Sequence, residues 1–528
     1  MKESEPSIVL MPDSRKTLIK KGLSATKYTV AFRVIAQGLG LIATICLVRV
    51  LSEHDYGIYN LLYSLIALMG MFFSFGIANT LQRFMPEYYN RGEYEIAHRL
   101  YKAASIIRLI SNVAVLGGIL LLWDYLAPLL KLTEYKPYFI LFCLIIILHL
   151  QRGILETCLE SYFLQKYSQG ISVFFVVIKG IGYVAALLFS WDMWLILIID
   201  FVAYFITFIL LELIYHKKVH RQGGTYPTFP RDERKRLTRF ALFYNFNDAG
   251  AGLLDANFDN FIIIMYLDPI AVGAYAFCNR VTRTAERILP ANYLLQLIRP
   301  LFFSGNSMAT SKQINQNYQL LLKLIYLCQI PLFCFFLLYS QECITILFGG
   351  KFLEYHLILV AVSFISLLNA FQVPVGLVAQ LKERVEIFLY SKIFAVYNLA
   401  ADVVFIHYLG LWGAVLATGS ATLGKNIFIW YFVRDNANVR GMAPFFLKTV
   451  GYWVIVVGIG WLLNHMILSN LIVLVAGTAW LGLAFWFQFR FVHLKKEEQE
   501  LLSELGLESR KMALLLRWSG LRNGLDKT

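Results

Sequence analysis

Three arginines occur at helical spacing in an otherwise apolar stretch of the sequence. Arg280, Arg283 and Arg287 are three and four residues apart, so an α-helix would carry all three on one face. A planar guanidinium group can donate two parallel hydrogen bonds to a phosphate. The spacing therefore predicts a binding face for an anionic group such as a diphosphate. Pro290, just beyond it, predicts a kink or break in the same helix.

Three aspartates precede the arginines. Asp248, Asp255 and Asp259 are seven and four residues apart, which also predicts a single helical face. A reversal of the chain between the two segments would bring the acidic and basic sets to matching depths. Two interpretations stay open. The sets form a buried ladder of ion pairs that only neutralises charge, or the pairing is partial and the carboxylates carry a proton or a sodium ion.

Two further groups of polar residues fall in predicted helices. Lys27 and Arg33, with Gln37, lie in the first one, and Arg152 and Glu156 are four residues apart in the fourth. Both groups are candidates for the same site. The simpler interpretation of the second group is an ion pair within one helix.

Four single charges lie in other apolar stretches. A charge in hydrocarbon costs at least about 2.5 kcal/mol on insertion scales, so such residues normally face the protein interior. The simplest expectation is a partner on a neighbouring helix. The four residues are Lys179, Asp200, Asp402 and Lys425.

The composition explains why these charges are informative. Of 528 residues, 58% are hydrophobic and only 16% are charged, whereas soluble proteins have about a quarter charged. The net charge of +14 lies mainly in the tails and in alternate loops, which indicates membrane orientation rather than nucleic acid binding. The seven cysteines are scattered without the paired spacing of a metal site, so we expect no metal and no cofactor.

Successive apolar runs predict an all-α integral membrane protein with about fourteen spans and no soluble catalytic domain. The predicted spans are 27–50, 56–80, 103–127, 137–162, 168–190, 193–215, 240–266, 271–300, 318–339, 355–379, 387–407, 411–433, 447–466 and 469–491.

Basic residues concentrate in the tails and in the segment 217–239, and the predicted loops on the opposite side are nearly free of them. The positive-inside rule then places both termini in the cytoplasm. The expected parts are a tail 1–26, a six-helix lobe 27–216, a basic linker 217–239, a second lobe 240–433, two helices in 447–491 and an amphipathic cytoplasmic tail 492–528.

An internal repeat supports the two lobes. VRVLSEHDYGIYN (48–60) and IMYLDPIAVGAYA (264–276) share a leucine, a glycine and a tyrosine at the same spacing. An even number of predicted spans separates the copies, which indicates parallel repeats that could enclose a cavity suited to alternating access. The matched residues are Leu51, Gly57 and Tyr59 with Leu267, Gly273 and Tyr275.

Several of these segments resemble the polysaccharide exporter and O-antigen flippase branch of the multidrug/oligosaccharidyl-lipid/polysaccharide (MOP) superfamily. They are LVRVLSEHDYGIYN, FGIANTLQRFMPE, LDPIAVGAYAFCNRV, ILFGGKF and LGLWGAVLATGSA. The resemblance covers nearly the whole chain, but its motifs are turns and packing glycines. It implies two six-helix lobes plus two helices, no cleavage chemistry, and residence in the cytoplasmic (inner) membrane of the cell.

The resemblance also implies a substrate class and partners. The expected substrate is a polyprenyl-diphosphate-linked oligosaccharide moved from the inner to the outer leaflet, with membrane lipids, a coupling proton or sodium ion, and other polysaccharide assembly proteins as candidate partners. Related lipid II flippases use cationic residues on the first and eighth helices, which here carry Lys27 and Arg33 and the three arginines. The second span, 56–80, has no basic residue, which argues against lipid II itself.

Two alternatives remain. A multidrug antiporter of the same superfamily would bind organic cations through carboxylates and aromatic rings, although the arginine face argues against it. An integral membrane enzyme of polysaccharide assembly would usually carry a large outer loop, and the longest expected here is about a dozen residues.

Overall fold

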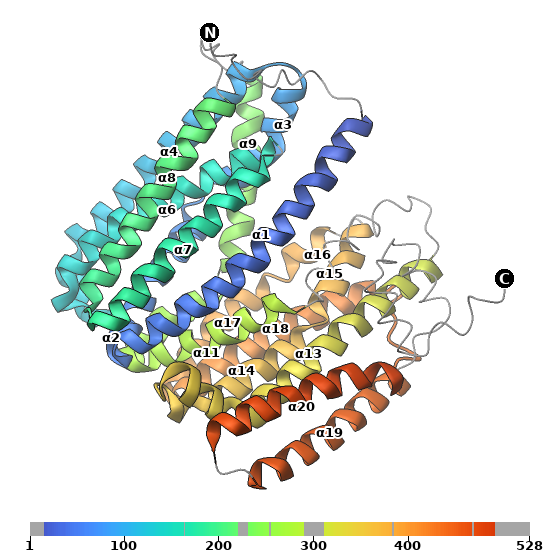
Figure 1. The fold of residues 1–528 in the computed structure, drawn as a ribbon. Coiled ribbons are helices and arrows are strands. Elements are labelled where there is room, and N and C mark those ends of the chain that lie inside the picture. The colour runs from blue at the N-terminus through green and yellow to red at the C-terminus, as the bar shows by residue number, and fades with distance from the viewer. Residues whose placement is uncertain are drawn as a thin grey trace, which may run out of the picture. The chain divides into compact units, whose positions relative to one another are not determined.

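The computed structural model describes residues 15–162, 164–219, 231–252, 255–289, 311–382, 385–466 and 469–491, and this part of the chain contains helices and no strand. The all-helical membrane fold is thereby confirmed. Pro290, the middle of the basic linker and the amphipathic tail 492–528 lie outside the described residues. The chain divides by its contacts into two compact units, Met1–Gly273 and Ala274–Thr528 (Figure 1), while the predicted domain boundaries stay predictions.

The first unit contains the helices of the predicted N-terminal lobe and the segment that follows the basic linker. Its elements are α1 (Arg15–Val50), α2 (Glu53–Phe72), α3 (Ile77–Asn90), α4 (Tyr94–Leu121), α5 (Trp123–Leu129), η1 (Thr133–Tyr135), α6 (Lys136–Ser161), α7 (Gln165–Phe189), α8 (Met193–Lys218), α9 (Arg231–Gly252) and α10 (Ala256–Tyr266).

The second unit begins within α11 (Pro269–Ile288). Its other elements are α13 (Ser311–Phe348), η2 (Leu353–Tyr355), α14 (His356–Asn369), α15 (Gln372–Leu381), α16 (Val385–Tyr390), α17 (Ile393–Leu409), α18 (Leu411–Val433), α19 (Ala443–Met466) and α20 (Asn470–Phe491).

Ten helices of the described part are long and apolar enough to cross a membrane, or eleven if the bent pair α2 and α3 forms one span. The predicted spans 240–266, 271–300 and 411–433 are not among them. Each contains ionisable side chains, which lower its mean hydropathy. A membrane helix can carry such groups on the side that faces other helices. The count of fourteen spans therefore stays a prediction.

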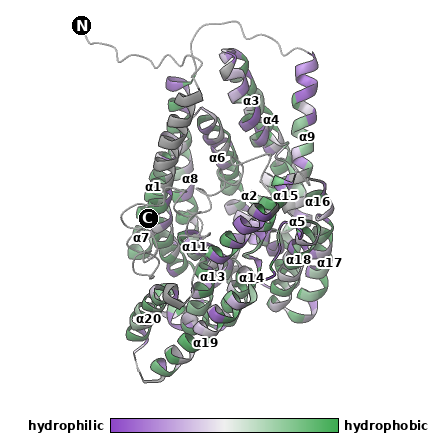
Figure 2. Cartoon of the chain, turned by 90° about the vertical axis from the view of Figure 1, so that its right-hand side faces the viewer, coloured by the Kyte–Doolittle hydropathy of each residue, from purple (hydrophilic) through white to green (hydrophobic). Residues whose placement is uncertain are grey.

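The surface of the units is apolar where a soluble protein would be polar. Ile181 and Leu188 on α7 are 67% and 73% exposed, and Val454 and Ile455 on α19 are both 64% exposed. Figure 2 shows the hydrophobic colour covering most of the helices. Large apolar side chains on an outer surface are favourable only in contact with lipid or another protein.

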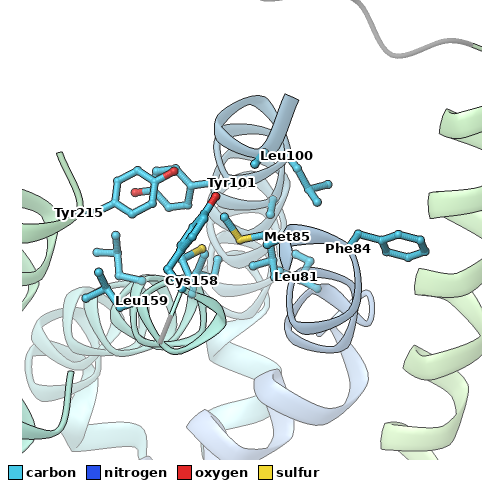
Figure 3. Packing of buried hydrophobic residues seen from close by; sticks show 14 of the residues in the cluster. Leu81, Phe84, Met85, Leu100, Tyr101, Cys158, Leu159 and Tyr215 are labelled. Carbon is cyan, nitrogen blue, oxygen red and sulfur yellow. The ribbon is translucent and has the colours of Figure 1, made fainter. Parts of the chain in front are cut away.

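The interior of the first unit is closely packed where α3, α4, α6 and α8 meet. Met85, Tyr101, Cys158 and Tyr215 belong to one buried cluster contributed by these four helices (Figure 3). All of them are less than 9% exposed. This core holds together the ends of α3, α4, α6 and α8 that carry its residues.

The second unit has a separate core built from α13, α15 and α18. Tyr318, Val378 and Ile429 are among its buried members. Further along the long helix α13, the hydroxyl-bearing ring of Tyr339 lies against Gly477 of α20. The C-terminal helix is therefore packed on this unit.

The internal repeat has a physical explanation in helix capping. Ser52 precedes α2, and its hydroxyl accepts a hydrogen bond from the backbone N–H of Asp55 at 3.0 Å. Asp268 is the equivalent residue before α11, and its carboxylate accepts from the N–H of Ala271 at 2.8 Å. In both copies the capping oxygen satisfies an N–H group that the first turn leaves unpaired.

The shared glycine of the repeat is explained by a close helix contact. A Cβ atom on Gly57 would lie 1.8 Å from the carbonyl oxygen of Pro269 and 2.5 Å from its carbonyl carbon. Both obstructing atoms are backbone atoms, so no side-chain rotation can make room. The first turn of α2 therefore approaches the start of α11 as only glycine permits.

We expect Gly57→Ala to destabilise the protein, because forcing an extra methyl group into a packed contact costs about 1–3 kcal/mol. The measurement is thermal unfolding of the detergent-solubilised chain. Gly180→Ala is the matched control, since a Cβ atom at Gly180 of α7 would meet nothing within 4 Å. Equal melting temperatures for the two variants would contradict the close-contact explanation.

Candidate functional site

The second predicted span is broken rather than continuous. Its halves, α2 and α3, meet at an angle of 53°. Phe75 and Gly76 in the break have φ angles of +48° and +58°, in the left-handed region that stops an α-helix. A Cβ atom on Gly76 would lie 2.2 Å from the carbonyl oxygen of Ala241 on α9, so the break also permits a close approach of these two segments.

The backbone groups freed by this break are satisfied by side chains from other helices. The amide oxygen of Asn245 on α9 accepts from the N–H of Phe75 at 2.7 Å and from the hydroxyl of Ser74 at 3.0 Å. Arg108 on α4 donates from Nη1 to the carbonyl oxygen of Phe73 at 2.8 Å. Irregular backbone at membrane depth is stable only when it is paired within the protein in this way.

The seventh predicted span, 240–266, is also interrupted, and its expected continuity was wrong. α9 ends at Gly252, and α10 begins after Asp255, whose carboxylate accepts from the N–H of Asn257 at 2.9 Å. Gly250 and Gly252 weaken the helix just before this point, and an aspartate N-cap stabilises a new start. The seven-residue spacing from Asp248 to Asp255 therefore crosses a helix break and does not define one face.

The three aspartates have different surroundings. Asp248 accepts a hydrogen bond from the amide of Asn79 on α3 at 3.1 Å. Asp255 is half-buried at the helix break, and Asp259 is fully buried in α10. The ladder that we predicted would join these residues of the first unit to arginines of the second, and it stays a prediction.

α9 runs antiparallel to α3 and is bonded to it near the predicted cytoplasmic side. Arg236 donates to both carboxylate oxygens of Glu87 at 3.1 Å, and the hydroxyl of Tyr88 donates to Glu233 at 2.6 Å. Hydrogen bonding to Glu87 raises the pKa of the Arg236 guanidinium above its usual range. α9 is thus bonded both to the break between α2 and α3 and to the far end of α3.

The predicted anion-binding arginines lie on one continuous helix, α11. Arg280 is half-buried, whereas Arg283 and Arg287 are exposed within the second unit. Val281 and Thr282 on the other side of the helix are buried, so the helix has a packed side and an arginine side. Glu286 accepts a hydrogen bond from Gln329 of α13 at 3.4 Å.

The predicted residues of the first span lie on α1, which packs along α7. Arg33 is exposed and Gln37 is half-buried. The side chain of Lys27 lies outside the described residues. Membership of these residues in a common site with the α11 arginines stays a prediction.

Two of the single charges pair with each other. Lys179 of α7 contacts the Asp200 carboxylate of α8 at 2.9 Å, which confirms the expected partner on a neighbouring helix for both. Asp200 is fully buried. Its oxygens also accept hydrogen bonds from three tyrosine hydroxyls, at 2.8 Å from Tyr59, 2.5 Å from Tyr63 and 2.6 Å from Tyr183. A carboxylate buried in this way is neutralised and fully hydrogen-bonded.

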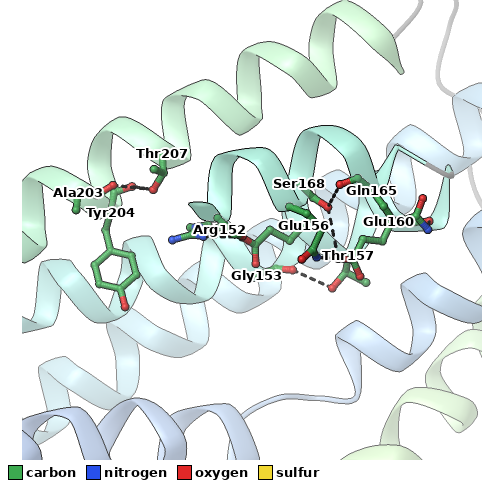
Figure 4. A network of polar contacts seen from close by, with 12 residues as sticks. Arg152, Gly153, Glu156, Thr157, Glu160, Gln165, Ser168, Ala203, Tyr204 and Thr207 are labelled. Atoms are coloured by element: carbon green, nitrogen blue, oxygen red, sulfur yellow. Dashed lines mark hydrogen bonds and ion pairs between the residues drawn. The ribbon is translucent and has the colours of Figure 1, made fainter. Parts of the chain in front are cut away.

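The fourth predicted span carries a second polar cluster (Figure 4). Arg152 and Glu156 of α6 form an ion pair at 2.7 Å, as the simpler interpretation of their spacing predicted. Ser172 of α7 donates to Glu156 at 3.0 Å, and the Arg152 guanidinium lies 4.3 Å from the ring centre of Phe175. This pair links α6 to α7 as well as joining two turns of one helix.

The tyrosines, Arg108 and Asn245 were not among the residues predicted for a site. Tyr59 and Tyr63 are four residues apart on α2, and Tyr183 follows Lys179 by four, so a polar stripe on each helix was a usable signal. Arg108 and Asn245 gave no local signal, because each bonds a segment far away in the chain.

The described residues contain no group of three or more histidine, cysteine, aspartate or glutamate side chains that could hold a metal ion. The seven cysteines are all free and buried. Buried free cysteines behave as small apolar groups, which agrees with a packing role.

The amino-acid sequence is similar to that of known proteins over most of its length. Residues 23–304 match the family described as polysaccharide biosynthesis protein. The lipopolysaccharide biosynthesis protein WzxC of Escherichia coli (strain K12) is 21% identical over 429 residues, which cover 79% of this chain and 81% of that protein.

Two solved structures have a similar fold. The lipid II flippase MurJ in its inward closed conformation aligns with a TM-score of 0.63 at 14% identity, covering 87% of this chain and 99% of that one. An inward-facing multidrug resistance MATE family transporter of the MOP superfamily aligns with a TM-score of 0.53 at 15% identity, covering 78% and 95%. Since the family match spans more than half of the sequence, the chain belongs to the polysaccharide biosynthesis protein family, and its helices have the same fold as MurJ and the MATE family transporter.

Proposed function

We propose that this protein moves a polyprenyl-diphosphate-linked oligosaccharide from the inner to the outer leaflet of the cell membrane by ion-coupled alternating access. The observation that carries the proposal is the arginine side of α11, formed by Arg280, Arg283 and Arg287. Three guanidinium groups within two helical turns suit a diphosphate, because each can donate two parallel hydrogen bonds to phosphate oxygens.

The broken helices support transport rather than a static scaffold. Discontinuous spans commonly form substrate sites in secondary transporters, and the unpaired backbone at each break then faces a cavity or a partner side chain. Here α2–α3 and α9–α10 are both broken and contact each other. Such a pair can bend without losing the hydrogen bonds within each half.

The relatives support the substrate class. The family description and the name of WzxC refer to polysaccharide and lipopolysaccharide biosynthesis, and the name of MurJ refers to flipping lipid II. The predicted span 56–80 carries no basic residue, which favours another lipid-linked sugar over lipid II. The names of these relatives and the positive-inside rule together support an inner-membrane protein with both termini in the cytoplasm.

An organic cation is a less suitable substrate for the first unit. One of its two fully buried aspartates, Asp200, already has Lys179 as counter-ion and three tyrosine hydroxyls as donors. A cationic drug would have to displace the lysine and leave it buried without its partner, which costs about 3–5 kcal/mol. A cation that approached the second unit would be repelled by its exposed arginines, Arg283 and Arg287.

Asp255 is our candidate for ion coupling. It is half-buried at a helix break, whereas Asp200 is fully buried and bonded to a lysine and three tyrosine hydroxyls. A carboxylate at such a break can exchange a proton or a sodium ion when the break opens to water. Asp248 and Asp259 lie on either side of it and are further candidates.

The arginine side of α11 is tested by transport in proteoliposomes. Arg280→Ala and Arg283→Ala should each lower the rate of movement of a labelled polyprenyl-diphosphate oligosaccharide by about 10- to 100-fold, because a charge-assisted hydrogen bond is worth about 1.5–3 kcal/mol. Arg440→Ala is the control, since it removes an exposed arginine outside the predicted spans. Wild-type transport rates for both α11 variants would contradict the proposal that these arginines bind the diphosphate.

The coupling proposal is tested with Asp255→Asn. Asparagine keeps the oxygen that caps α10, so the helix start should be preserved while the titratable group is lost. We expect the protein to stay folded and its transport to lose its response to an imposed proton or sodium gradient. Asp192→Asn is the matched control, because Asp192 caps α8 by the same type of bond at 3.1 Å. An unchanged gradient response in Asp255→Asn would make Asp255 purely structural.

A further inference from the structure

A groove between α3 and α9 has the features of a site for an anionic lipid. Its volume is about 680 Å³, and the nine lining residues come only from these two helices. This lies within the range of about 300–1,000 Å³ that is typical of ligand pockets. The lining residues are Arg83, Phe84, Asp232, Lys235, Arg236, Arg239, Phe240, Phe243 and Tyr244.

The charged and apolar residues of the groove are separated along α9. Lys235 and Arg239 come first, and Phe243 and Tyr244 follow in the direction of the predicted membrane interior. From Lys235 to Phe243 the helix rises by about 12 Å at 1.5 Å per residue. Figure 2 shows the same change, with hydrophilic colour on the first turns of α9. The groove is therefore amphipathic along its length.

The positive charge of the groove is only partly neutralised. Arg83 and Arg236 are paired with Glu87 at 3.0 and 3.1 Å. Lys235 and Arg239 are exposed, and neither has an ion pair within the part of the chain that the structure describes. Two cations at helical spacing i, i+4 can contact one anionic group together.

The apolar end is preorganised by aromatic contacts. The ring of Phe84 lies 5.1 Å from that of Phe240, and Phe240 lies 4.6 Å from Tyr244. Arg236 stacks on Phe84 with its guanidinium carbon 4.8 Å from the ring centre. Phe243 is 62% exposed, so its ring is available to contact an apolar chain.

We propose that this groove is a cytoplasmic loading site for the substrate, separate from the arginine side of α11. Lys235 and Arg239 bind the diphosphate, and Phe240, Phe243 and Tyr244 contact the first isoprene units. Asp232 lies at the end of the groove nearest the start of α9. Its carboxylate repels the phosphates and so keeps them beside Lys235 and Arg239. The assignment of a polyprenyl diphosphate as the occupant rests on the proposed function, but the site itself can be tested without transport.

The test is binding of farnesyl diphosphate to the purified full chain in nanodiscs of neutral phosphatidylcholine. Lys235→Ala/Arg239→Ala should weaken this binding at least 10-fold, because two charge-assisted contacts are lost. Phe240→Ala/Phe243→Ala should weaken binding of farnesyl diphosphate and leave that of inorganic diphosphate unchanged. Arg231→Ala/Arg234→Ala is the matched control, since it removes the same charge from α9 at exposed positions outside the groove.

Photo-crosslinking locates the bound lipid. A diazirine-bearing farnesyl diphosphate should label peptides of α3 and α9. The amount of label should be lower in the Lys235→Ala/Arg239→Ala variant. Labelling of α11 alone, or binding unchanged in that variant, would overturn the loading site. Displacement by an equal amount of phosphatidylglycerol would also overturn it, since the groove would then be a general surface for anionic lipids.

The two proposals can fail separately. If the groove is labelled specifically but the protein transports no lipid-linked oligosaccharide, the loading site is supported and the proposed function is contradicted. If transport is normal but only α11 is labelled, the proposed function is supported and the loading site is contradicted.

Discussion

The structure depends on one constraint, that polar groups inside hydrocarbon must be paired within the protein. Asp200 satisfies it with Lys179 and three tyrosine hydroxyls from α2 and α7. The break between α2 and α3 satisfies it with Asn245 and Arg108. Each solution joins helices that are far apart in the sequence, so the same bonds that remove the energetic penalty also determine which helices are neighbours.

The constraint also explains why the breaks and charges occur together. A break frees backbone N–H and C=O groups, and a polar side chain from an adjacent helix must then be present to bond them. α9 supplies Asn245 to the first break and is itself interrupted beyond Gly252. Polar contacts at Glu87 and Glu233 hold its other end against α3. A helix held in this way can pivot as a unit, which is the kind of motion that alternating access requires.

Much of the architecture could be predicted from the sequence, because hydropathy and helical spacing are local properties. The predicted span 193–215 lies within α8, which is long and apolar enough to cross a membrane, and the pair Arg152 with Glu156 follows from a spacing of four. The interruption of 240–266 was not predicted, since hydropathy averages over the whole window and gives little weight to Gly250 and Gly252.

The pairing of distant polar residues was harder to predict. Lys179 and Asp200 could each be expected to have a partner. The spacing of Tyr59 and Tyr63 marks a polar stripe on α2, but local spacing does not show that this stripe meets Asp200. The groove between α3 and α9 likewise arises from two segments about 150 residues apart, whose approach depends on Gly76 and the helix bend. Such sites become visible only when the helices are assembled.

The central claim is that the protein moves a lipid-linked oligosaccharide across the membrane. The most direct test is lipid extraction and mass spectrometry on cells that lack the protein, with a probe that reports which leaflet holds polyprenyl-linked glycans. We predict that one defined polyprenyl-diphosphate oligosaccharide accumulates in the cytoplasmic leaflet and that the intact gene reverses this. Unchanged lipid-linked glycans together with altered sensitivity to cationic drugs would contradict the account and indicate a multidrug exporter.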